Sequence, residues 1–237
     1  MTKLLYLEDS YIKEFKAEVI EISEKNNSLV LDRTAFYPGG GGQPCDLGKI
    51  KFQNESSKII KVKKIDGRIR HFSKDKLPAV GTEVLGQIDW ARRYKFMRTH
   101  TALHALSAVV WRDYHVQVTG GSFKALTGRL DFEFEKLNSD MVVEIENKVN
   151  YETNKGLGVS WKVLPRAEAE KIPDLIRTKV NLLPPNLTEI RIVKIDGLDL
   201  QADGGTHVKN TAEIGKIKII DYKSKGRFNK RLKIKIE

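Results

Sequence analysis

The residues best suited to chemistry in this sequence include two histidines, His100 and His104, four positions apart. Apolar residues around them recur at helical spacing, and on a helix two side chains four positions apart project to the same side. Two imidazoles placed in this way can reach one metal ion. The pair alone is weak evidence, because histidines at this spacing also occur inside ordinary cores.

A second group lies in residues 201–208, with the sequence QADGGTHV. Its glycine pair lets the backbone turn tightly, so that Asp203 and His207 can point to a common centre. Together with the helical pair they make a plausible four-ligand set for Zn²⁺. The alternative is a glycine-rich loop whose charged side chains are exposed to solvent. A zinc peptidase is not expected, because that chemistry needs a glutamate where this chain has Thr101.

A third segment, residues 33–48, contains four consecutive glycines, Gly39 to Gly42. It is not a nucleotide-binding loop, because no Lys-Ser/Thr pair follows and Pro44 occupies the last glycine position of a dinucleotide fingerprint. Such a segment lets backbone amides approach a ligand closely, and Thr34 and Gln43 place polar groups beside it. The alternative is a flexible hairpin tip.

These segments must be positioned by two kinds of structure. Residues 1–88 have short apolar runs separated by turn residues, which predicts a small β-barrel or sandwich. The expected strands are Lys16–Ile22, Ser28–Asp32, Lys58–Ile65, Arg68–Phe72 and Val84–Ile88, with a two-residue turn at Asp66-Gly67.

At Asp89 the pattern changes to an acidic helix cap followed by an amphipathic run. We therefore expect a second, α+β domain over residues 89–237, with helices packed on an antiparallel sheet. Its expected elements are the histidine helix, a helix capped by Ser139 and ended by Gly156, and strands at Lys124–Phe134, Val159–Leu164, Thr188–Ile195, Ile214–Ile220 and Leu232–Ile236.

The chain carries a formal net charge of +11 and has a pI near 9.5. This excess favours polyanionic partners, because each neutralised phosphate releases condensed counterions. The single cysteine, Cys45, suits a reducing compartment. Neither a signal peptide nor an apolar stretch of about 20 residues is visible, so we expect a cytoplasmic protein that does not enter a membrane.

In order and separation, the three segments resemble the medium-length alanyl-tRNA editing proteins and the editing domain of alanyl-tRNA synthetase. The resemblance spans nearly the whole chain. It implies one Zn²⁺ per chain, with His100, His104 and His207 as ligands. Asp203 stands where those proteins usually have cysteine, so it is expected to ligate through oxygen, to hold a bound water, or to leave an open metal position.

The resemblance further implies a freestanding hydrolase that removes serine wrongly esterified to alanine tRNA, with Thr34 and Gln43 lining the amino-acid pocket. No nucleotide cofactor is expected, and the oligomeric state is expected to be monomeric or weakly dimeric. The residues expected to bind RNA are basic and clustered: Arg92, Arg93, Arg98, Lys223, Lys225, Arg227 and Arg231.

Two other functions remain open at this point. The chain could be a non-catalytic RNA-binding module in which zinc only stabilises the fold. It could also edit another mischarged tRNA, such as a threonyl-tRNA, since those editing domains share the paired histidines. The sequence leaves open the cleavage of glycyl-tRNA, the identity of a general base and the tRNA elements recognised.

Overall fold

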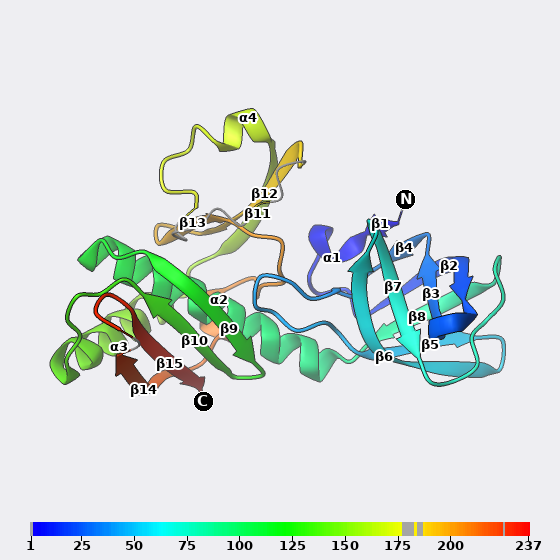
Figure 1. Cartoon of the computed structure of the whole chain (residues 1–237), viewed down its shortest axis with the longest axis horizontal. Helices are drawn as coiled ribbons and strands as arrows, with labels where there is room; N and C mark the ends of the chain where they lie inside the picture. The colour runs from blue at the N-terminus through cyan, green and yellow to red at the C-terminus, as the bar shows by residue number, and fades with distance from the viewer. Residues whose placement is uncertain (1, 177–182, 184–186, 225) are drawn as a thin grey trace. The chain divides into compact units, whose positions relative to one another are not determined.

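The computed structural model describes residues 2–176, 183, 187–224 and 226–237 (Figure 1). The chain divides into two compact units, Met1–Lys95 and Phe96–Glu237. The division falls within helix α2 (Trp90–Tyr114), which begins one residue after the expected boundary at Asp89. The Asp89 side chain accepts a hydrogen bond from the Arg92 amide at 3.1 Å, as expected of a helix cap.

The first unit is built on a closed six-stranded barrel in the order β2-β3-β7-β6-β5-β8, with every neighbouring pair antiparallel. Closure leaves no unpaired strand edge in the barrel. The prediction of a small β-barrel is confirmed. Its strands are β2 (Glu14–Ser23), β3 (Ser28–Leu31), β5 (Gly48–Phe52), β6 (Glu55–Ile65), β7 (Arg68–Ser73) and β8 (Glu83–Ile88). Smaller elements are β1 (Lys3–Leu4), α1 (Leu5–Glu8), the 3₁₀ turn η1 (Glu24–Asn26) and β4 (Arg33–Thr34).

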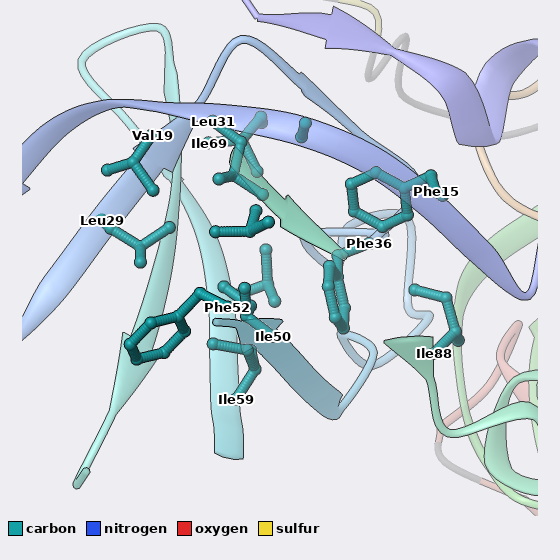
Figure 2. Packing of buried hydrophobic residues seen from close by; sticks show 14 residues of the cluster. Phe15, Val19, Leu29, Leu31, Phe36, Ile50, Phe52, Ile59, Ile69 and Ile88 are labelled. Atoms are coloured by element: carbon teal, nitrogen blue, oxygen red, sulfur yellow. The ribbon is translucent and has the colours of Figure 1, made fainter. Parts of the chain in front are cut away.

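The barrel forms because its strands alternate apolar and polar residues. In β2, Phe15, Ala17 and Val19 are buried while Lys16 and Glu18 between them are exposed. A side-chain period of two sends the first set to one face of the strand. Figure 2 shows the apolar side chains of several strands meeting in the barrel interior.

The turn between β6 and β7 has the predicted chemistry. Asp66 has φ of 48° and Gly67 has φ of 77°, so both central residues are left-handed. This backbone matches the twist of an antiparallel hairpin. By contrast, strand β5 was not predicted, because its alternation of lysine with apolar residues covers only a few positions.

The second unit is α+β, with antiparallel sheets β14-β15-β10-β9 and β11-β12-β13, and this class is confirmed. Buried residues of α2 include Met97, Leu103 and Leu106. The strands are β9 (Val118–Lys124), β10 (Thr127–Phe132), β11 (Val159–Pro165), β12 (Glu189–Ile195), β13 (Asp199–Ala202), β14 (Ile217–Ser224) and β15 (Lys230–Ile236). The other helices are α3 (Ser139–Thr153), α4 (Arg166–Ala169) and the 3₁₀ turn η2 (Thr211–Glu213).

Two local predictions in this unit need correction. The strand expected over Lys124–Phe134 is present as the shorter β10, and the strand before it, β9, was not predicted; Leu126, with φ of 58°, turns the chain between them. The cap of α3 is Asn138, whose side chain accepts from the Met141 amide at 2.9 Å, and Ser139 is the first helical residue. Within the described ranges, no helix combines the length and apolar character that a membrane span needs.

Candidate functional site

The second unit brings together the four side chains predicted to bind a metal. His100 and His104 lie on α2, whereas Asp203 and His207 lie on the loop that follows β13. One candidate ligand atom from each residue lies within 4.8 Å of the others. The three histidines are buried and Asp203 is half-buried. Because the helix and the loop are far apart in the sequence, the cluster forms only when this unit folds.

The spacing of the donor atoms matches a metal site. Asp203 places Oδ2 2.9 Å from Nε2 of His207 and Oδ1 3.6 Å from Nε2 of His100. A tetrahedral ion with bonds of about 2.1 Å sets its ligand atoms about 3.4 Å apart. Three imidazoles and a carboxylate are also a suitable donor set for a divalent transition metal. The cluster could therefore hold one such ion.

His104 is oriented by a buried carboxylate. Its Nδ1 lies 2.9 Å from Oδ2 of Asp199, a residue only 4% exposed. The Gln201 side-chain amide donates to both Asp199 oxygens, at 3.1 and 2.9 Å. A carboxylate that accepts from Nδ1 fixes the tautomer and leaves Nε2 available to a metal. Sequence reasoning missed Asp199, although it lies only four residues before Asp203.

His207 is oriented by Thr101. The Thr101 hydroxyl donates to the Met97 carbonyl at 3.0 Å, so its oxygen accepts from Nδ1 of His207 at 3.2 Å. Nε2 of His207 then carries a lone pair directed at the Asp203 carboxylate. Two acceptors at 2.9 Å repel each other unless a positive charge lies between them, which is the environment that a bound cation satisfies.

Burial sets the protonation state of these ligands. It lowers the pKa of His207 to about 4 and holds the pKa of His100 well below its ordinary value. Burial alone would raise the pKa of Asp203, but the adjacent imidazoles of His100 and His207 hold it well below its ordinary value. Neutral imidazoles and an ionised carboxylate are the forms that bind metals.

The ligand loop is braced by Arg191 on β12. Its Nη1 donates to the carbonyls of Asp203 and Gly205, both at 3.0 Å. Asp203 Oδ2 also accepts from the Gly205 amide at 2.6 Å. The Arg191 guanidinium lies 5.4 Å from the centroid of the Trp161 ring. These contacts hold the loop that carries two of the predicted ligands.

In the first unit, the glycine segment forms a tight turn. Gly40 and Gln43 exchange backbone hydrogen bonds of 3.0 and 2.8 Å. Between them, Gly41 and Gly42 have φ of 55° and 85°, which side chains other than glycine rarely allow. The Tyr37 hydroxyl donates to the Gly40 carbonyl at 3.1 Å, and Gln43 is buried. The turn is thus anchored to its own unit.

Thr34 is fully buried at the end of β4. Its Oγ1 lies 2.9 Å from Nε2 of His71 and accepts from the Phe36 amide at 3.1 Å. His71, which sequence reasoning did not single out, is also fully buried. The predicted pocket residue therefore belongs to an internal hydrogen-bonded group of the barrel.

The predicted RNA-binding residues differ in exposure. Arg93 is fully buried, with Nε 2.9 Å from both oxygens of Asp46, so its side chain offers no surface to RNA. We therefore leave Arg93 out of any RNA-binding set. Arg92 is half-buried and donates to the Cys45 carbonyl.

The remaining basic residues lie in the second unit. Lys223 and Arg227 are exposed on the terminal hairpin, while Lys225 lies outside the described residues. Arg231 is half-buried and pairs with both oxygens of Asp131, at 2.6 and 2.7 Å. Arg98 is also half-buried and donates to the Ile214 carbonyl at 2.8 Å.

Comparison with known protein families gives one match in each unit. Residues 4–92 match the model "tRNA synthetases class II (A)", and residues 190–233 match "Threonyl and Alanyl tRNA synthetase second additional domain". The chain is 41% identical to the alanyl-tRNA editing protein AlaX-M of Saccharolobus solfataricus over 98% of both chains. The chain belongs to the AlaX-M family of alanyl-tRNA editing proteins.

Other relatives agree with this assignment. The AlaX-M protein of Methanosarcina barkeri is 37% identical over 98% of both chains. The alanine–tRNA ligase of Pyrobaculum arsenaticum is 39% identical over 92% of this chain but only 25% of its own length. As a member of the AlaX-M family, the chain is an aminoacyl-tRNA deacylase.

Proposed function

We propose that this chain hydrolyses serine from mischarged alanine tRNA, using Zn²⁺ held by His100, His104, His207 and Asp203. The observation that carries the proposal is the cluster of three imidazoles and one carboxylate whose candidate ligand atoms lie within 4.8 Å of one another. Two of these imidazoles are held by Asp199 and Thr101 with Nε2 left for the metal. Family membership supports a mischarged tRNA as the substrate.

The reaction is the hydrolysis of an ester. Water adds to the seryl carbonyl carbon, the bond to the ribose oxygen breaks, and serine and free tRNA are released. A zinc ion held there would act as a Lewis acid on the carbonyl oxygen or on the attacking water. Asp203, His100, His104 and His207 would hold the ion, while Arg191 and Asp199 keep their loop and ring in place.

Selection of serine requires a group that recognises its hydroxyl. An activation site shaped by size rejects an added hydroxyl poorly, by about 10²-fold, whereas a site built to bond the hydroxyl discriminates far better. We assign this role to Thr34, with Gln43 holding the carbonyl or the attacking water. Because both side chains are buried, the proposal requires substrate binding to make the Thr34 hydroxyl accessible. The test is deacylation of alanine tRNA charged separately with serine, glycine and alanine. Rapid loss of serine with alanine spared is expected, and stable seryl-tRNA would refute the proposal.

The oxygen ligand Asp203 can be tested by substitution. Asp203→Cys should keep or tighten zinc binding, because a thiolate is a stronger zinc ligand than a carboxylate. Asp203→Ala should weaken zinc binding by at least about tenfold. Competition with a chromogenic chelator measures both affinities. If the cysteine variant loses zinc while the alanine variant keeps it, Asp203 is not a ligand.

Binding of tRNA should depend steeply on salt, because the chain is strongly basic. Neutralising Lys223, Lys225 and Arg227 together should reduce the log-log slope of affinity against salt by about 2 to 3. Fluorescence anisotropy with labelled tRNA between about 50 and 200 mM salt measures it. Neutralising three exposed lysines of the barrel, Lys58, Lys61 and Lys63, provides the control. An unchanged slope in the hairpin variant would place the tRNA surface elsewhere.

A further inference from the structure

A buried histidine of the barrel, His71, contacts the proposed hydroxyl sensor directly. His71 lies on β7, and its ring packs edge to face against Phe36 with centroids 5.4 Å apart. Nε2 lies 2.9 Å from Oγ1 of Thr34, and Nδ1 lies 3.3 Å from the Leu29 carbonyl oxygen. All of these residues belong to the first unit, and all are fully buried.

The Leu29 contact fixes the tautomer of the imidazole. A carbonyl oxygen can only accept, so Nδ1 of His71 must carry a proton. Burial lowers the pKa of His71 to about 4, so the ring is neutral near pH 7 and holds a single proton. Nε2 is therefore an acceptor, and the Thr34 hydroxyl must donate to it.

The hydrogen-bonding capacity of Thr34 then follows by counting. A hydroxyl has one proton and two acceptor positions. The proton goes to His71, and one acceptor position takes the Phe36 amide proton at 3.1 Å. Within the described part of the chain, one acceptor position of Oγ1 remains. Thr34 can accept one further hydrogen bond but cannot donate another.

We propose that His71 is a positioning residue that turns the Thr34 hydroxyl into an obligate acceptor, so that the site selects amino acids whose side chain donates an O–H. The inference rests on the proposed function, because Thr34 must meet the seryl side chain. Serine supplies the required proton. Alanine cannot supply it, so an alanyl ester lacks the hydrogen bond that a seryl ester gains at Thr34.

The first test changes only the substrate. Alanine tRNA charged chemically with 3-fluoroalanine presents a fluorine of nearly hydroxyl size that cannot donate a hydrogen bond. The wild-type chain should cleave this ester at about the rate of alanyl-tRNA and at least about tenfold slower than seryl-tRNA. Cleavage of the fluoroalanyl ester at the seryl rate would overturn the inference.

The second test changes the positioning residue. His71→Phe keeps a ring in the barrel but removes the acceptor, and should lower kcat/KM for seryl-tRNA about tenfold while leaving alanyl-tRNA cleavage unchanged. His71→Gln can donate to Leu29 and accept from Thr34, and should restore most of the seryl activity. In a Thr34→Val background, His71→Phe should have no further effect. Additive losses in the double variant would overturn the coupling.

A spectroscopic measurement separates this inference from the proposed function. The ¹⁵N chemical shifts of His71 in the full chain should report a neutral ring with its proton on Nδ1 from pH 8 to pH 5. A proton on Nε2 would overturn the inference even if seryl-tRNA is cleaved. If wild-type protein leaves seryl-tRNA intact, the proposed function fails, and the inferred role of His71 in selection fails with it whatever the tautomer.

Discussion

Replacing His100 and His104 together with alanine should remove the bound zinc and lower the rate of seryl-tRNA deacylation by at least about 10³-fold. These residues supply two of the four clustered donors, and stabilisation of developing charge by a metal is worth several kcal/mol. Elemental analysis of the purified variant measures the metal, and release of labelled serine measures the reaction. Circular dichroism before and after chelation shows whether the metal also supports the fold.

The matched control is His115→Ala, which removes an exposed histidine just after the same helix. It should keep one zinc per chain and full activity. Full zinc retention by the double variant would refute the metal assignment. If chelation removes both zinc and secondary structure, the metal is structural, and the non-catalytic RNA-binding function becomes the better explanation.

Thr34→Val should abolish most of the preference for serine over alanine. Valine keeps the shape of threonine but removes the hydroxyl, so seryl-tRNA cleavage should fall about tenfold to a hundredfold while alanyl-tRNA cleavage stays low. Parallel time courses on seryl-, glycyl- and alanyl-tRNA give the ratios. Because the same change leaves Nε2 of His71 without its donor, thermal unfolding must be measured beside activity.

The control for this prediction is Thr82→Val, which makes the same chemical change at a half-buried position between β7 and β8. It should leave all three deacylation rates unchanged. If Thr34→Val remains fully active and selective, the chain is still an editing enzyme, but its selectivity does not depend on this hydroxyl.

The features predicted correctly from sequence are those encoded over a few residues. The i, i+4 spacing of His100 and His104 requires only one helix, and the Asp66-Gly67 turn requires only two residues with positive φ. Closure of the barrel was harder to predict, because it depends on strand β5 pairing with β8, which lies 31 or more residues later in the chain. Short strands whose partners are distant carry little local signal.

The supporting residues of the site were missed for the same reason. Asp199 meets His104 across 95 positions, and His71 meets Thr34 across 37. No motif marks a buried carboxylate or imidazole as the partner of a residue so far away. Arg93 was wrongly included among the RNA-binding residues. In the sequence, an arginine that pairs with a buried carboxylate such as Asp46 cannot be distinguished from an exposed arginine of a basic cluster.

The four clustered side chains contain nitrogen and oxygen donors but no sulfur. A thiolate ligand can be oxidised to a sulfenic acid and then further, which destroys its ability to bind metal. Carboxylate and imidazole groups do not enter that series of reactions. Cys45, the only cysteine, lies in the other unit. If the cluster holds zinc as proposed, a site with Asp203 in place of a cysteine would bind the metal less tightly but would resist oxidation by peroxide, so editing at such a site would persist under oxidative stress.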